Sequence, residues 1–283
     1  MPHEANATVS HAFAALVGRT DDERIDLLRA ALAIARAEYP DLRLEPYIAR
    51  IDSLGRRVCS QVSDYGDANA TIAAINRVLF DQEHFRGNRE HYYDPRNSFL
   101  NEVLDRKLGI PISLSIVYLE VAKRAGLPLF GVGMPGHFLL KHYDPEGRQV
   151  LIDVYDRGAI VSSGECQNKL DEIYLGHLDL RPEFLVAVSK RQILTRMLNN
   201  LKNIYASSRN FRKALLIVDM VLAIYPRSPE DVKQRAMLRY SLDDWRGAVD
   251  DLDDYLKMSP DASDADEIRE TALSIRRGLA RLN

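Results

Sequence analysis

Apolar residues recur at helical spacing through the first third of the chain. Thr20 and Glu23, three residues apart, fit the capping box that begins a helix, and apolar positions follow directly. We expect three helices here, over about residues 20–38, 45–58 and 68–80. The pattern therefore predicts a helical region over residues 1–93.

Two more helices are expected next. Asp94 as N-cap and Pro95 at the first helical position predict a helix that ends at Gly109. The following helix is expected over about 112–125, with Gly126 as its C-terminal stop.

The pattern then changes to that of strands. A short apolar strand is expected over 129–132, and two longer ones over 137–143 and 149–155 flank a turn that contains proline and glycine. If this hairpin turns about Pro145, His137 lies directly opposite Asp153 on one face of the sheet.

Beyond Pro182 the chain is expected to be helical and contains a repeat. Three features recur 34 residues apart, as in the tetratricopeptide repeat (TPR): Asn210-Phe211 and Asp244-Trp245, Ala214 and Ala248, and Pro226 and Pro260. We expect units over about 195–228 and 229–262, with a closing helix over 264–282. Inter-helix contacts are expected at Phe211, Ala214, Leu215, Trp245, Ala248 and Val249.

Composition narrows the classes of function. Hydrophobic residues make up 46% and the net charge is −3, without a basic stripe, so we expect no nucleic-acid partner. The longest apolar run, 214–225, is too short to span a membrane. Two isolated cysteines and a poor secretion signal favour a reducing, cytoplasmic location. The histidine spacing fits no metal site, and no cofactor is expected.

Two sequence blocks carry a family resemblance. Leu108-Gly-Ile-Pro-Ile-Ser-Leu114 and Pro135-Gly-His-Phe-Leu139, with the repeats that follow, resemble the bacterial SirB-type family. That family joins a transglutaminase-like (papain-like) core to C-terminal TPR units, and certain F-box proteins contain a related module. The resemblance covers roughly residues 20–270. It implies an α+β fold with a helical region (1–93), a transglutaminase-like core with a small antiparallel sheet (94–182) and TPR-like helices (183–283).

The resemblance also implies candidate catalytic residues. Active relatives place a cysteine at a helix start, where the helix dipole favours the thiolate, with a histidine base and an orienting aspartate. His137 and Asp153 match the last two, but no cysteine occupies the slot at 111–113. Ser113 is the nearest hydroxyl, and Ser115 a poorer second. Ser113 is a nucleophile candidate that needs full general-base help, or simply a helix-start hydroxyl.

Three functions stay open. The first is a non-catalytic, regulatory protein-binding scaffold, a pseudoenzyme that engages a protein through its TPR groove or degenerate cleft. The second is an acyl transferase or amide hydrolase that uses Ser113, His137 and Asp153. The third is a TPR adaptor with a purely structural core. For Cys59 and Cys166 we expect structural or incidental roles, because neither lies at the expected helix start.

Overall fold

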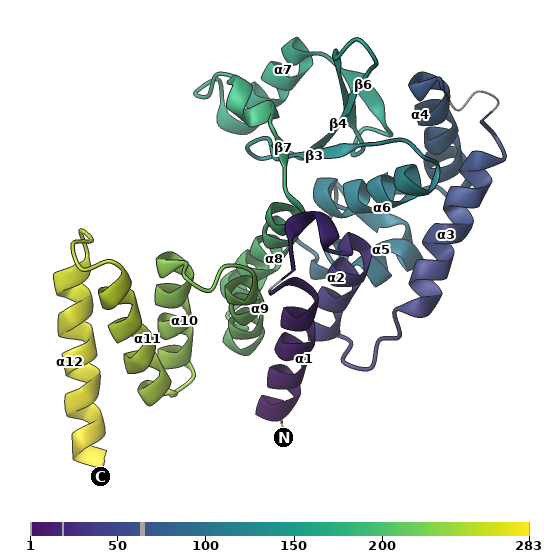
Figure 1. Ribbon diagram of the computed structural model, residues 1–283. Helices are drawn as coiled ribbons and strands as arrows, with labels where there is room; N and C mark the ends of the chain where they lie inside the picture. Colours follow the sequence, from purple (N-terminus) through teal and green to yellow (C-terminus); the bar gives the residue numbers. More distant parts are fainter. Residues whose placement is uncertain (1, 19, 63–65, 283) are drawn as a thin grey trace. The chain divides into compact units, whose positions relative to one another are not determined.

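The computed structural model describes residues 2–18, 20–62 and 66–282. Its contacts group the chain into two compact units, one of residues 21–197 and one of residues 1–20 with 198–283 (Figure 1). We call them the core unit and the repeat unit. The fold is α+β, as expected. The division at residues 93 and 182 stays a prediction.

The core unit begins with helices and continues into a sheet. Its α-helices are α2 (Leu27–Ile34), α3 (Glu45–Cys59), α4 (Ala68–Asn76), α5 (Leu100–Arg106), α6 (Pro111–Arg124) and α7 (Ser163–Tyr174). Its short 3-10 and π segments are η1 (Asp22–Arg24), η2 (Ala35–Ala37), η3 (Arg77–Gln82), η4 (Pro95–Asn97) and η5 (Pro182–Leu185). Its strands are β1 (Arg86–Gly87), β2 (Leu108–Gly109), β3 (Phe130–Val132), β4 (Leu139–Tyr143), β5 (Gln149–Asp153), β6 (Ala159–Val161) and β7 (Ala187–Val188).

Two predicted helix starts are wrong. Helix α2 begins after Asp26, whose carboxylate accepts a hydrogen bond from the Arg29 N–H, so the Thr20 capping box does not form its start. Asp94 does act as an N-cap, but only of the short turn η4. The predicted helix itself, α5, starts at Leu100, after a residue in the extended conformation. The capping signal at Asp94 correctly indicated a helical turn, η4. It did not indicate the extended residue, Phe99, that separates this turn from α5.

The main sheet has the order β6-β5-β4-β3-β7, with every pair antiparallel. Helix α7 packs on one face through Cys166 and Leu170, and α6 contacts β3 and β4 from the other side (Figure 1). Strand β7 and helix α7 are among the elements that were not expected from the sequence. Strand β7 interrupts the region predicted to be wholly helical, and α7 begins at a capping box between Ser162 and Glu165.

The turn is centred one residue later than expected, so each residue of β4 pairs with a partner two positions further along β5 than expected. Leu140 pairs with Ile152, which centres the turn on Glu146 rather than Pro145. Continued by one step, this register places Asp153 opposite Leu139. His137, two residues before Leu139, is therefore a diagonal neighbour of Asp153. Because side chains alternate with a period of two, the pair still shares a face of the sheet.

The repeat unit is built from antiparallel helices. They are α1 (Pro2–Val17), the second part of α8 (Lys190–Ser207), α9 (Phe211–Ile224), α10 (Pro229–Ser241), α11 (Trp245–Met258) and α12 (Ala265–Leu282). Equivalent residues of the repeat have equivalent roles, because Asn210 caps α9 and Asp244 caps α11 through side-chain oxygens. Ala214 and Ala248 are both fully buried. The helical array that the 34-residue period predicted is therefore present.

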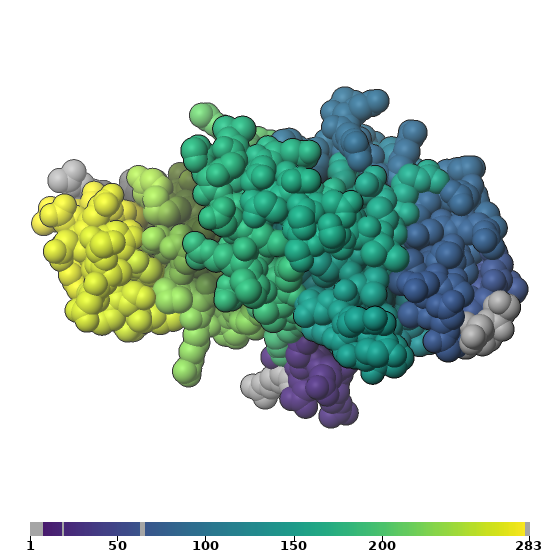
Figure 2. Space-filling view, turned by 90° about the horizontal axis from the view of Figure 1, so that it is seen from above, coloured from purple at the N-terminus to yellow at the C-terminus, as the bar shows by residue number. Residues whose placement is uncertain are grey.

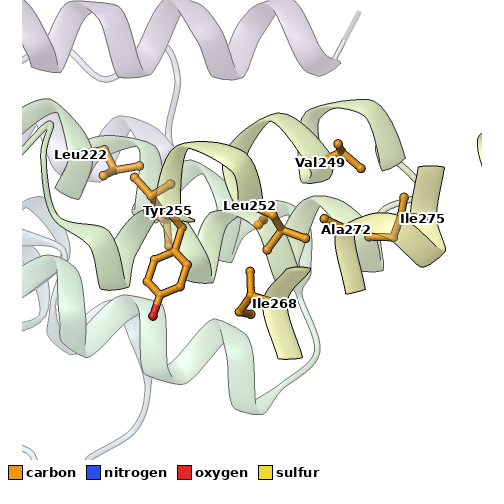
Figure 3. Close-up of a cluster of buried hydrophobic side chains, with 10 residues drawn as sticks. Leu222, Val249, Leu252, Tyr255, Ile268, Ala272 and Ile275 are labelled. Carbon is orange, nitrogen blue, oxygen red and sulfur yellow. The ribbon is translucent and has the colours of Figure 1, made fainter. Parts of the chain in front are cut away.

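A cluster of apolar side chains joins the last helices (Figure 3). Leu252 and Tyr255 of α11 meet Ile268 and Ile275 of α12. The space-filling view shows α12, in yellow, at the edge of this unit against the light-green helices (Figure 2). Trp245 is only partly buried against the cluster, so truncating it should cost less than removal of a fully buried ring.

Candidate functional site

His137 and Asp153 are in direct contact. The His137 Nε2 atom lies 3.0 Å from Asp153 Oδ2, and both residues are buried. The loop before β4 positions the histidine and the end of β5 positions the aspartate. The expected hydrogen bond across the hairpin is thus present, and the catalytic role of the pair stays a proposal.

Asp153 is held as a carboxylate by four contacts. Besides His137, its Oδ2 atom pairs with Lys169 Nζ at 2.9 Å, and its Oδ1 atom accepts from the N–H groups of Tyr155 and Asp156. Burial alone raises the pKa of the Asp153 carboxyl, but His137 and Lys169 outweigh burial and lower that pKa from 3.8 to about 2. Burial lowers the pKa of Lys169, but its ion pair with Asp153 outweighs burial and raises that pKa.

This charge state determines the tautomer of neutral His137. An ionised carboxylate can only accept, so Nε2 carries the proton that it shares with Asp153. The Nδ1 atom is then the nitrogen available as an acceptor. A nucleophile activated by His137 would have to donate to that atom.

Ser113 does not make this contact. Its Oγ atom accepts from the Ile110 N–H at 3.1 Å and donates to the Asn97 carbonyl oxygen at 2.6 Å, with the Ile110 carbonyl at 3.2 Å. Its exposed fraction is 0%. The structure therefore brings His137 and Asp153 together and uses Ser113 to link the start of α6 to η4. Ser115, the poorer candidate, is also buried, and its hydroxyl has no hydrogen-bond partner in the described chain.

The start of α6 is tightly packed around the Ser113 hydroxyl, which leaves no space for a substrate beside it. Pro111 occupies the first helical position and has no N–H. Gly109, two residues earlier, packs closely against Ser113, since a Cβ at position 109 would lie 2.8 Å from the Ser113 Oγ atom. The segment that would carry a nucleophile is packed around a buried hydroxyl, so it resembles a structural helix start.

Neither cysteine occupies this region. Cys166 is fully buried in α7, where burial raises the pKa of its thiol and the charge of Asp153 raises it further. Cys59, at the end of α3, is partly buried, and its Sγ atom donates to the Arg124 carbonyl at 3.6 Å. The environment of Cys166 disfavours a thiolate.

We expect iodoacetamide to label both thiols slowly in the folded protein, because Cys166 is fully buried with a raised thiol pKa and Cys59 is partly buried. The measurement is mass spectrometry of the labelled chain at pH 6 and pH 8, with urea-unfolded protein as the fully reactive control. Fast labelling at pH 6 that His137→Ala abolishes would contradict this expectation.

Several residues around the pair were not found from the sequence. Lys169 contacts Asp153, the Tyr155 ring packs edge-on against His137 at 6.1 Å, and Arg196 donates to the His137 carbonyl at 2.7 Å. The capping box at Ser162 could have indicated a helix that places Lys169 near the sheet. No local signal indicates Arg196, which is far from the hairpin in sequence.

Comparison with known proteins supports both parts of the fold. The description of the transglutaminase-like superfamily matches residues 45–199, and that of the tetratricopeptide repeat matches residues 201–272. A UPF0162 protein of Xylella fastidiosa (strain 9a5c) is 36% identical over 252 residues, which cover 88% of this chain and 89% of that protein. The chain belongs to the UPF0162 family of transglutaminase-like proteins. The resemblance to the SirB type is thereby confirmed.

Other relatives of this UPF0162 chain differ in size. A UPF0162 protein of Vibrio cholerae is 28% identical, covering 85% of this chain and 88% of that protein. Human F-box only protein 21 is 30% identical over 238 residues, which cover 72% of this chain but 36% of the F-box protein. The module therefore also occurs within a longer protein.

Two kinds of feature are absent from the described residues of the UPF0162 chain. Within residues 2–18, 20–62 and 66–282, no three histidine, cysteine or acidic side chains gather as a metal site. Of the helices in the described part of the chain, none is long and apolar enough to cross a membrane.

Proposed function

We propose that this protein is a non-catalytic, regulatory protein-binding protein. The observation that carries the proposal is the Ser113 hydroxyl, which is buried and hydrogen-bonded to the backbone at the position where the family implies a nucleophile. An acyl-transfer reaction needs an accessible nucleophile within reach of its base. A buried hydroxyl that already donates to Asn97 does not meet that need.

The repeat unit supports the binding role. Side chains from α8, α10 and α12 line a groove of about 530 Å³, in which Met237 is 49% exposed. Lys202 and Lys233 border the groove and are paired with Asp231 and Asp264 at 3.1 and 3.0 Å. Because these ion pairs neutralise both lysines, the groove suits a peptide segment with apolar side chains rather than a bare anion.

One observation favours the rival hydrolase. His137 and an ionised Asp153 are paired as a base and its orienting group would be. Catalysis would require Ser113 to leave Asn97 and reach His137 Nδ1. The two hypotheses therefore differ in the reactivity of Ser113.

We expect a fluorophosphonate probe to leave Ser113 unlabelled in the full-length protein, because the hydroxyl is inaccessible and lacks a base. Intact-mass and peptide mass spectrometry measure the labelling, with an active serine hydrolase as positive control. Stoichiometric labelling at Ser113 that His137→Ala removes would establish the hydrolase and refute the proposal.

The binding role is tested separately with an unbiased library of end-blocked decapeptides. Retained peptides should bind the full-length protein saturably and compete with one another. If the library yields no peptide retained above a matched urea-unfolded control, the protein-binding proposal fails, whatever the reactivity of Ser113.

A further inference from the structure

Arg196 lies beside His137 without a carboxylate partner. Its NH2 group donates to the carbonyl oxygens of Met134 at 3.0 Å and His137 at 2.7 Å, and its guanidinium lies 5.6 Å from the Phe138 ring. Its NH1 and Nε groups have no hydrogen-bond partner among the described residues, and no ion pair involves it there. Three N–H donors of this guanidinium are therefore free.

The surroundings of Arg196 make this lack of a partner costly. Burial lowers the pKa of the guanidinium, and Tyr92 and Tyr174 offset only part of that effect. A cation removed from water without a counter-ion is unfavourable. The position is therefore suited to an anion supplied from outside the chain.

Arg89 adds a second cation near the same histidine. Its guanidinium lies 5.7 Å from the Tyr155 ring, which in turn packs against His137. Gly87 permits this arrangement, because a Cβ there would lie 2.2 Å from the Tyr155 ring. Arg89 is exposed and has no ion pair within the described part of the chain.

Neither arginine is paired with a carboxylate of the described chain. Lys169 pairs with Asp153, and no ion pair of Arg89 or Arg196 is found among the described residues. Exposed apolar and aromatic side chains accompany them, because the Ile173 and Tyr174 side chains lie next to Gly136. These and their neighbours are unusually exposed: Tyr92 37%, Tyr93 78%, Ile173 45%, Tyr174 37% and Leu175 81%.

We propose that Arg89, Tyr92, Tyr155, Tyr174 and Arg196, here called the arginine–tyrosine cluster, bind a carboxylate on an apolar segment of a partner protein. The inference rests on the proposed protein-binding function and names its ligand. The free Nη1 and Nε groups of Arg196 can each donate a charge-assisted hydrogen bond to a carboxylate oxygen. Arg89 approaches from the solvent side, and the tyrosine rings flank the apolar neighbours of the acidic group.

A carboxylate fits this cluster better than a phosphate. Of the two cations in the cluster, Arg196 is partly buried, whereas Arg89 is exposed and its charge is screened by water. The cluster therefore matches a ligand with one negative charge better than one with two. The carboxylate can come from a glutamate or aspartate side chain or from a chain terminus.

The test uses end-blocked decapeptides with random flanking positions and one fixed central residue. That residue is glutamate, glutamine or phosphoserine, and a fourth set has a central glutamine with a free C-terminal carboxylate. Binding to the full-length protein is measured by fluorescence anisotropy. We expect the best glutamate peptides to bind about tenfold more tightly than their glutamine counterparts, the value of one charge-assisted hydrogen-bond pair.

Variants locate the effect. Arg89→Gln should reduce the glutamate preference to about threefold or less, and it should fold normally because Arg89 is exposed and makes no hydrogen bond in the described structure. Arg196→Lys keeps the charge but loses the separate Nη1 and Nε donors of the guanidinium, so it should weaken binding as well. The matched control is Arg56→Gln, an exposed arginine of α3, which should leave the preference unchanged.

The outcomes separate the two proposals. Comparison of the fourth set with the glutamate set identifies the source of the carboxylate, and preference for either over glutamine supports the inference. Peptides that bind equally well with glutamine, or better with phosphoserine, overturn the carboxylate assignment but leave the protein-binding proposal intact. A preference that survives in Arg89→Gln and Arg196→Lys overturns the cluster as its site. Retention of no peptide at all refutes both.

Discussion

Replacing Asp153 with asparagine should lower the free energy of unfolding of the core unit by about 3 kcal/mol at neutral pH, at the lower end of the cost of breaking a buried ion pair. The carboxylate is fully buried and accepts from His137, Lys169 and two backbone N–H groups. Asparagine has only one acceptor oxygen and leaves Lys169 without a counter-charge. Lys169 is 27% exposed and can partly turn to water, which limits the loss.

Urea unfolding followed by the near-ultraviolet circular dichroism of the tyrosines measures this change, with hydrogen exchange of β5 and α7 as a local readout. The matched control is Glu146→Gln, since Glu146 pairs with Arg148 on the surface and its side chain is 64% exposed. That control should change stability by less than about 0.5 kcal/mol. Equal stabilities of the Asp153 variant and the parent would show that the buried pair contributes nothing to the fold.

The difference between parent and variant should depend on pH in a defined direction. The pKa of Asp153 falls from 3.8 to about 2 on folding, so the folded state binds fewer protons and the stabilisation is complete above the unfolded value. It amounts to about 2 kcal/mol and is lost as the pH falls from about 4 toward 2, with about 1 kcal/mol lost by pH 3. A difference that grows on acidification would contradict the assignment.

The sequence predicted those parts of the fold that depend on local patterns. The 34-residue recurrence matched Asn210 with Asp244, which both cap a helix in the structure, and it placed Ala214 and Ala248 at inter-helix contacts, where both are buried. The hairpin pattern brought His137 and Asp153 together even though its register was misplaced, because the error left both residues on the same face. A pairing shift of two residues keeps every side chain on its face of the sheet, whereas a shift of one residue would move it to the other face.

The parts that were missed depend on contacts between distant segments. Asn97 and Ser113 are joined by a hydrogen bond that no local pattern announces, and that bond decides whether Ser113 is accessible. Arg196 reaches the His137 loop from the start of α8, and Lys169 reaches Asp153 from a helix that the sequence did not predict. The candidate dyad could thus be found from spacing, whereas its environment could not.

Deleting α12, from Ala265 onward, should unfold the repeat unit. The helix contributes Ile268 and Ile275, 7% and 8% exposed, to the cluster around Leu252, and its removal would expose both sides of that contact. Two buried isoleucines and the surface they cover correspond to roughly 5 kcal/mol or more of lost burial, comparable to the whole stability of a small domain.

Trp245 is the only tryptophan of the chain and lies in α11, so its fluorescence reports on the repeat unit in thermal and urea unfolding of the deletion variant. Two point variants separate the loss of packing from the loss of a chain segment. Ile268→Ala should lower the free energy of unfolding by about 2–4 kcal/mol. Leu273, on the same helix, is 48% exposed, so Leu273→Ala should lower it by less than about 1 kcal/mol. If the deletion variant melts with the parent's midpoint and cooperativity, α12 does not close the array. A single TPR cannot bury its apolar face without a neighbour. If α12 does not pack on α11, the groove that α12 lines together with α8 and α10 is not a stable binding surface.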